Sequence, residues 1–274
     1  MGKRFPPSCS GPWPRGGLDV RTRSPALDRR GVMLALLGIG ASVGACSENP
    51  NTGRSQLIVV SDEMLTELSA QTWAEIKRTV PQSADQRAQT RLRAIGEQMI
   101  ARANLPGLDW EFVVFDSPEI NAFVLPGGKI GFYRGLIDVV ANDGEIAAVM
   151  GHELGHVLGR HAAERVSQQE AVRLGVAAAS LAFSEDLGEY ADEAAAALGA
   201  GLTYGVILPY SRAHELEADR IGVDLMSKAS FDPGDAVRFW ERMVATNEAS
   251  GAPLAWLSTH PAGQDRLEAL RALI

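Results

Sequence analysis

The sequence predicts an α+β fold that is mostly helical, with a small β-sheet packed on one central helix. Three observations support this class. Apolar residues recur at helical spacing over most of residues 61–273. Residues 110–133 switch to period-two alternation rich in β-branched and aromatic side chains. Directly after them, residues 142–150 combine a helix start with an apolar run that leads into His152-Glu153-Leu154-Gly155-His156.

Residues 1–45 carry the features of a leader followed by a lipoprotein signal peptide. Residues 1–28 are rich in Pro, Gly, Arg and Ser, a composition typical of disorder. Residues 32–43 form an apolar run that has the length of a signal-peptide core and is too short to span a bilayer comfortably. The alternative for this run is a buried N-terminal helix.

The apolar run ends in Val43-Gly44-Ala45-Cys46, which resembles the bacterial lipobox, where small residues precede a lipidated cysteine. We therefore expect Cys46 to anchor the chain to a membrane that faces the periplasm. Ser47 resembles the residue that directs sorting to the outer membrane. Both Sec and twin-arginine export stay open, because Arg29 and Arg30 resemble a twin-arginine signal. Signal processing would remove Cys9, so no disulfide is predicted.

The charge of the chain argues against nucleic acid as a partner. Residues 1–45 carry seven Lys or Arg and two Asp or Glu, whereas the remaining residues carry 19 and 32. Such an acidic body repels phosphate. The sequence does not indicate an oligomeric state.

The folded domain is expected to span residues 61–274, behind a polar N-terminal tether at 46–60 that ends in a short strand-like run. Ser61-Asp62-Glu63 predicts a helix start, and Pro81 ends that helix. The elements expected in chain order are helices at 61–80 and 84–103, strands at 110–115, 121–125 and 129–133, the motif helix, and helices at about 161–183, 186–204, 211–229, 233–248 and 263–273.

Residues 174–183 and 194–208 are rich in Ala and Gly and nearly uncharged. Neither reaches the ~18–20 residues that a membrane-spanning helix requires, and acidic residues separate the two segments. We expect buried helices packed closely on the motif helix. A re-entrant membrane hairpin is the alternative.

The motif at 152–156 predicts a catalytic metal site. Positions i and i+4 of a helix lie on one face, about 6 Å apart along the axis, so His152 and His156 can reach one ion. Neutral imidazole is a good zinc ligand, and Glu153 can serve as the general base for metal-activated water attack. The alternative is a buried helix with two hydrogen-bonded histidines.

A catalytic zinc ion usually takes three protein ligands, so a third must come from elsewhere in the chain. The candidates downstream of the motif are His161, His214, Glu215, Glu217, Asp219 and His260. Glu215 and Asp219 are i and i+4 on one helix face, so one can bind metal while the other supports a ligand histidine. Glu217 points away from that face and is expected to be solvated.

Five sequence blocks, in this order, resemble a zinc metallopeptidase family that includes the CAAX prenyl protease, the heat-shock protease HtpX, BepA and LoiP. The blocks are NPNTGRSQL, NAFVLPGGKIGFYRGL, GHELGHVLGRHAAER, SRAHELEAD and STHP. The resemblance covers nearly the whole chain after Cys46 and implies a zincin-like metalloprotease domain. We find no counterpart of the membrane helices of HtpX and the prenyl protease or of the BepA repeats, so we expect a single-domain lipoprotein of the LoiP kind.

This resemblance implies that Glu215 is the third metal ligand and that Asp219 orients a ligand histidine, since both match the family's E-x-x-A-D pattern. It also implies that Asn121, Ala122 and Phe123 lie on an edge strand beside the cleft. An extended peptide can pair with such a strand.

The remaining histidines are less constrained. His260 resembles a histidine that, in BepA-like proteins, can occupy the fourth zinc position and hold the enzyme inactive. Alternatively, Ser258 or Thr259 caps the last helix and His260 merely sits in the turn. His161 is expected to be structural, since three ligands are already assigned. His214 either stabilises an oxyanion or faces solvent.

Together these features predict a zinc-dependent endopeptidase of the bacterial cell envelope, with one Zn²⁺ per chain. We expect it to be periplasmic, anchored by lipid to the outer membrane, and to cleave misfolded or misassembled envelope proteins. The alternative is an envelope assembly or chaperone lipoprotein that keeps zinc for folding and has latent or little protease activity.

Overall fold

The computed structural model describes residues 46–105, 107–187, 208–250, 254–260 and 264–274. Residues 1–45 and the helix predicted at 186–204 lie wholly or almost wholly outside them. The described elements are β1 (Cys46–Glu48), β2 (Ser55–Leu57), α2 (Asp62–Thr79), α3 (Gln86–Ala103), β3 (Glu111–Phe115), β4 (Ala122–Leu125), β5 (Lys129–Tyr133), α4 (Arg134–Val139), α5 (Asp143–Leu158), α6 (His161–Leu187), α8 (Leu208–Lys228), α9 (Gly234–Ser250), α10 (Ala255–Thr259) and α11 (Gln264–Arg271). The predicted mostly helical α+β class is confirmed.

A three-stranded sheet has the strand order β3-β5-β4, with β5 parallel to β3 and antiparallel to β4. In its register, Gly131 of β5 lies between Val113 and Phe123. A Cβ atom at Gly131 would lie 2.4 Å from Cζ of Phe123, so the aromatic ring requires a glycine at this position. β4 forms one edge of this sheet.

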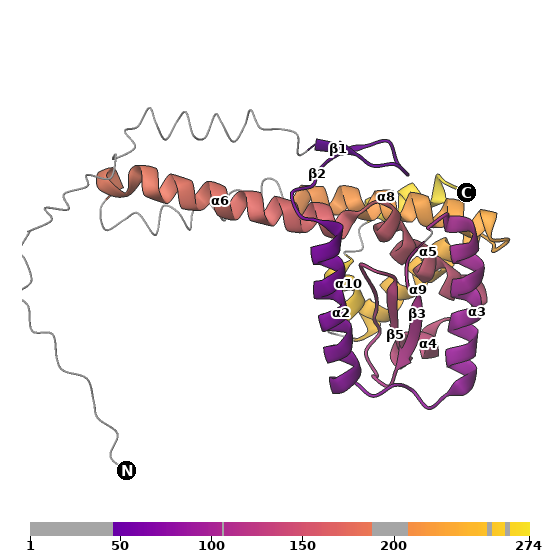
Figure 1. Cartoon of the computed structure of the whole chain (residues 1–274). Helices are drawn as coiled ribbons and strands as arrows, with labels where there is room; N and C mark the ends of the chain where they lie inside the picture. The colour runs from indigo at the N-terminus through magenta and orange to yellow at the C-terminus, as the bar shows by residue number, and fades with distance from the viewer. Residues whose placement is uncertain (1–45, 106, 188–207, 251–253, 261–263) are drawn as a thin grey trace, which may run out of the picture.

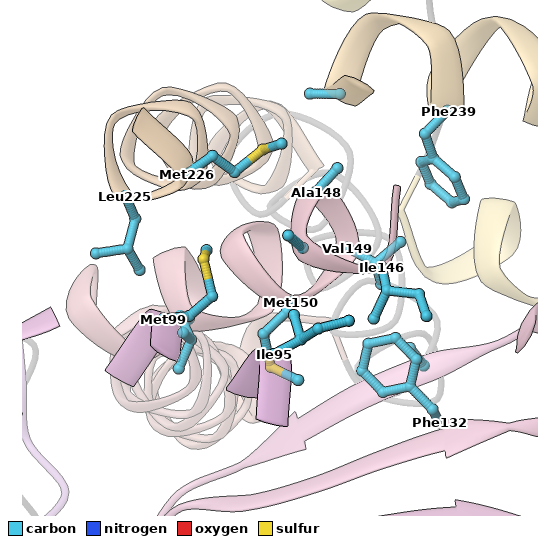
Figure 2. Close-up of a cluster of buried hydrophobic side chains, with 14 of the residues drawn as sticks. Ile95, Met99, Phe132, Ile146, Ala148, Val149, Met150, Leu225, Met226 and Phe239 are labelled. Carbon is cyan, nitrogen blue, oxygen red and sulfur yellow. The ribbon is translucent and has the colours of Figure 1, made fainter. Parts of the chain in front are cut away.

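Helices cover both faces of the sheet. On one face, Trp73 of α2 packs edge-on against Phe115 and Phe123, with ring centroids 5.5 and 6.1 Å away. The other face meets the main core, to which α3, α5, α8 and α9 contribute. Figure 2 shows part of this core, with the labelled side chains Ile95, Met99, Phe132, Ile146, Ala148, Val149, Met150, Leu225, Met226 and Phe239.

The start of α5 is fixed by paired hydrogen bonds between polar side chains and the main chain. The side chain of Asn142 accepts from the Glu145 amide at 2.8 Å, and Oε2 of Glu145 accepts from the Ala141 amide at 2.7 Å. Arg242 of α9 contacts the same carboxylate at 3.2 Å. These contacts satisfy amides at the start of the helix and fix where α5, which carries the motif at 152–156, begins.

Residues 46–60, which the sequence predicted to be a polar tether, contain a hairpin that contacts the C-terminal end of α5. β1 and β2 pair as an antiparallel hairpin, in which Asn49 and Gln56 are each only 1% exposed. Asn49 donates to the Leu158 carbonyl at 3.0 Å, and Gln56 donates to the Gly159 carbonyl at 2.6 Å. The polar side chains therefore satisfy carbonyls at the C-terminal end of α5 instead of facing water.

The prediction that residues 174–180 are buried against α5 is wrong. α6 runs away from the body of the protein (Figure 1), and Leu174 is 62% exposed. A Cβ atom at Gly175 would meet nothing within 4 Å, so the small side chains here do not reflect close packing. Among the described helices, none has the length and apolar character needed to cross a membrane.

Candidate metal centre

His152 and His156 lie one turn apart on the same face of α5, with their Nε2 atoms 3.1 Å apart. Both rings are buried. Gly155, inside the motif, lies against α8, where an added Cβ would come within 2.5 Å of the Ala218 carbonyl oxygen. A glycine at this position therefore lets α8 approach the histidine pair closely.

α8 crosses α5 and places a carboxylate between the two rings. Oε2 of Glu215 lies 3.2 Å from Nε2 of His152, and Oε1 lies 3.4 Å from Nε2 of His156. Glu215 is itself buried. The three residues that the sequence and its family resemblance nominated as ligands thus meet at one place.

His260, at the end of α10, completes the group. Its Nδ1 atom lies 3.1 Å from Nε2 of His152 and 3.0 Å from Oε2 of Glu215. One ligand atom from each of His152, His156, Glu215 and His260 lies within 4.8 Å of the others, and the described residues contain no second group of this kind. Imidazole nitrogens with one carboxylate are a donor set that zinc accepts, so these side chains fit a metal ion.

Glu153 lies beside this group and is only 2% exposed. Its Oε1 atom lies 3.5 Å from Nε2 of His260 and makes no hydrogen bond to any described residue. Burial of a carboxylate oxygen without a donor costs free energy. Such an oxygen fits a group that accepts a proton from a molecule bound at the metal centre.

Asp219 and Arg266 support His152 from behind. Oδ1 of Asp219 lies 2.8 Å from Nδ1 of His152, and a carboxylate only accepts, so Nδ1 carries the proton and Nε2 is left for a metal. Arg266 of α11 donates through Nε and Nη2 to both oxygens of Asp219 and through Nη1 to Glu215 at 2.9 Å. Arg266 was not predicted from the sequence, because nothing in its local pattern distinguishes it from a surface arginine.

His161 and His214 form a second buried cluster next to the metal group, with their rings stacked 4.2 Å apart. Nε2 of His161 lies 3.0 Å from Oε2 of Glu217, and Nε2 of His214 lies 3.0 Å from Oε2 of Glu164. The expectation that Glu217 is solvated is wrong: its side chain is 13% exposed, because Arg54 of the N-terminal hairpin and His161 cover it. His214 likewise contacts Glu164 rather than solvent.

A cleft of about 580 Å³ opens onto Glu153, His156 and His260. Phe123 and Val124 of β4 form one wall of the cleft. The start of α2, the end of α5 and the first turns of α6 also line the cleft. Their apolar lining residues are Leu65, Val157, Ala162, Ala163 and Val166. The motif at 152–156 therefore faces a groove that is largely apolar and open to solvent.

The strand segment singled out from the sequence borders this cleft. Ala122 and Phe123 begin β4 at the sheet edge, and the carbonyl of Asn121, just before it, accepts from the Tyr133 amide at 3.0 Å. Ala122 is buried in the main core on one face of the sheet. Phe123 lies on the other face and lines the cleft.

Comparison with protein families agrees with this geometry. The model of peptidase family M48 matches residues 86–274, a segment that contains every member of the metal group. The chain belongs to peptidase family M48.

Curated relatives of this M48 chain come from mitochondria and from bacteria. It is 40% identical over 173 residues to the mitochondrial metalloendopeptidase OMA1 of Schizosaccharomyces pombe, covering 62% of the chain and 48% of the relative. It is 33% identical over 242 residues to OMA1 of Bos taurus, covering 82% and 45%. It is 29% identical over 189 residues to the beta-barrel assembly-enhancing protease of Yersinia pestis, covering 66% and 37%. The chain thus spans less than half the length of each.

Burial and charge set the protonation of the M48 metal group. Burial, followed by the charge of His152, lowers the pKa of His156 well below its usual value, so this ring is neutral near pH 7. Burial raises the pKa of Glu215, but His152 and His260 outweigh burial and lower it strongly. Burial and Arg266 lower the pKa of His152, yet Asp219 and Glu215 together raise it to about 9. Metal binding at His152 therefore competes with a proton.

Proposed function

We propose that this M48 chain is a zinc-dependent endopeptidase of the bacterial cell envelope. One observation carries the proposal. His152, His156 and Glu215 converge beside Glu153, whose buried Oε1 atom makes no hydrogen bond to a described residue, and Glu153 and His156 line a cleft bordered by an edge strand.

His152, His156 and Glu215 would hold the zinc ion, and Asp219 would orient His152. Zinc, when bound, supplies a Lewis acid that activates water toward a peptide carbonyl. Glu153 accepts the proton of that water at Oε1 and then donates it to the nitrogen of the leaving amine. Glu153 is almost fully buried but lines the cleft, so its carboxylate can reach a molecule bound there.

An extended polypeptide is the substrate class that the cleft favours. β4 ends the strand order of the sheet, so its outer main-chain groups can pair with a further strand. A peptide added there would pass along Phe123 and Val124 toward Glu153 and His156. Misfolded or misassembled envelope proteins expose extended apolar segments of this kind.

We propose further that the protein acts in the periplasm and is anchored to the outer membrane by a lipid on Cys46. The apolar run at 32–43 and the lipobox-like residues after it support this placement. β1 begins at Cys46, so a lipid there would attach to an ordered hairpin. The name of the Yersinia pestis relative links that protein to β-barrel assembly, which supports envelope substrates for this one.

The position of His260 favours a second candidate, an envelope assembly or chaperone lipoprotein with latent or little protease activity. Nδ1 of His260 lies among the ligand atoms, 3.1 Å from His152 and 3.0 Å from Glu215. As a fourth protein ligand, His260 would take the place that water needs at a catalytic metal. The metal would then serve the fold.

Substitution of Glu153 by Gln separates these candidates. If the chain is a protease, Glu153→Gln should retain one zinc per chain, measured by elemental analysis, and lose at least ~100-fold in cleavage of casein or an unfolded outer-membrane protein. Glu97→Gln, at an exposed position of α3, is the matched control and should cleave like the wild type. Retained cleavage by Glu153→Gln would reject the mechanism. Complementation of a deletion strain by Glu153→Gln would favour the chaperone candidate.

A further inference from the structure

The two motif histidines are supported on their outer nitrogens by different parts of the chain. Behind His152, contacts run from Asp219 to Arg266 of the last helix, α11. Behind His156, the first contact is His161, whose Nδ1 atom lies 2.9 Å from Nδ1 of His156. His161 follows the motif in α6 and does not belong to the metal group itself.

The carboxylate of Glu217 fixes the direction of the two hydrogen bonds that link it through His161 to His156. Oε2 of Glu217 lies 3.0 Å from Nε2 of His161, and a carboxylate only accepts, so Nε2 of His161 donates. In a neutral ring, Nδ1 of His161 is then an acceptor, and Nδ1 of His156 must donate to it. The remaining nitrogen of His156, Nε2, is therefore unprotonated where it faces His152 and Glu215. This is the tautomer that a metal ligand needs.

The row of contacts ends on the N-terminal hairpin. Arg54 donates to Glu217 at 3.1 Å and, through its other two nitrogens, to Glu164 at 2.9 and 2.6 Å. Gln56, on the same hairpin, donates to Glu164 at 2.8 Å and to the Gly159 carbonyl at 2.6 Å. The hydrogen bond from Arg54 thus holds in place the carboxylate of Glu217, the acceptor on which the orientation of His161 depends.

A second metal site is the obvious alternative for this cluster, and the contacts argue against it. Both carboxylates already accept from Arg54, whose fixed positive charge repels a cation. His161 and His214 stack face to face, 13° from parallel, rather than pointing nitrogens at a shared point.

We propose that His161 and Glu217 are positioning residues that hold His156 in its metal-binding tautomer, and that Arg54 makes the hairpin at 46–57 part of the metal centre. The inference deepens the proposed function, because it assumes that His156 binds the metal. It predicts that a change at Arg54, a hairpin residue that does not line the cleft, alters metal binding.

The test measures the affinity of each full-length variant for zinc alone, by competition with a chromophoric chelator. Glu217→Gln and Arg54→Ala should each weaken zinc binding by about 10–100-fold and change the visible spectrum of the cobalt-substituted protein, because His156 is no longer held. Arg54→Lys keeps the charge but lacks the planar fork, so it should lie between Arg54→Ala and the wild type. Asp224→Asn, at an exposed position of α8, is the control and should bind zinc like the wild type.

Peptidase measurements add a second readout beside the cobalt spectrum, which reports the ligand geometry and which loss of stability alone would not change. The variants should lower kcat at unchanged KM, since the cleft residues are untouched. Arg54 is partly exposed, so we expect Arg54→Ala to fold. This variant therefore still tests the inference if Glu217→Gln fails to fold. The inference would be overturned if either folded variant bound zinc with an affinity within twofold of the wild type and showed an unchanged cobalt spectrum. A wild type that binds zinc but cleaves nothing would reject only the proposed function, and one that binds no zinc would reject both.

Discussion

The backbones of Gly151 on α5 and Gly222 on α8 are in direct contact. A Cβ atom added to Gly222 would lie 2.7 Å from the carbonyl carbon of Gly151 and 2.8 Å from the amide nitrogen of His152. This close crossing brings Glu215, two turns earlier on α8, within reach of both motif histidines. The two helices can approach this closely because glycine has no side chain at either position.

Gly222→Ala should therefore separate the two helices. We expect a loss of roughly 1–3 kcal/mol in the free energy of unfolding, measured by urea denaturation, and weaker zinc binding. Gly175→Ala is the control, since a Cβ there meets nothing within 4 Å and alanine favours a helix. If Gly222→Ala had the unfolding free energy and the zinc affinity of the wild type, the close helix crossing would not determine the geometry of the metal group.

Arg266→Ala should be among the most destabilising single changes in the described chain. The guanidinium contacts Asp219 and Glu215 and lies 3.9 Å from the centre of the Trp240 ring, with only 5% of its side chain exposed. Its removal leaves two buried carboxylates without their cation, which costs about 3–5 kcal/mol. Urea denaturation of the metal-free protein measures this loss. Arg271→Ala, on the exposed side of α11, should change stability by less than ~1 kcal/mol.

His260→Ala should raise basal proteolysis, with self-cleavage as a further sign. The ring lies among the ligand atoms, so its removal opens a coordination position for water. Initial rates of casein cleavage at fixed zinc measure the effect. Ser258 and Thr259 belong to α10, and α11 begins only at Gln264. The alternative that one of them caps the last helix is therefore not supported. A rate that stays the same or falls would instead assign His260 a structural or substrate-stabilising role.

The contribution of Glu164 to stability should depend on pH. Burial raises the pKa of Glu164, but hydrogen bonds from His214, Arg54 and Gln56 outweigh burial and lower it to about 2. Because the folded value lies below the usual one, the stabilisation is complete above pH ~4.5 and is lost as the pH falls toward 2. We expect it to reach about 2 kcal/mol, since the partial exposure of Arg54 screens part of the effect.

The measurement compares the wild type with Glu164→Gln by urea denaturation between pH 3 and 7, in the absence of metal. The difference in unfolding free energy should be largest at neutral pH and shrink on acidification. Glu170→Gln, on the exposed face of α6, should show a small difference at every pH. A difference between wild type and Glu164→Gln that is constant with pH would contradict the assigned cause.

Short-range regularities in the sequence were enough to predict much of the fold. Apolar spacing predicted the helix at 84–103, which the structure places at Gln86–Ala103, and alternation predicted all three strands of the main sheet. The short helices α4 and α10 were missed, because six or five residues show too little periodicity. The Ala- and Gly-rich residues 174–180 were misassigned as buried, because composition says how closely a helix can pack and not whether a partner is present.

By itself the sequence nominated candidate metal ligands and placed His152 and His156 on one helix face, since helical geometry acts within one turn. Only the tertiary structure decided that Arg54 meets Glu217, 163 residues later, and that Arg266 meets Asp219, 47 residues earlier. Such contacts depend on which helix faces cross and on how closely the glycines of α5 and α8 let them approach. No local pattern records that information, because the free energy that fixes a helix crossing comes from packing distant segments together.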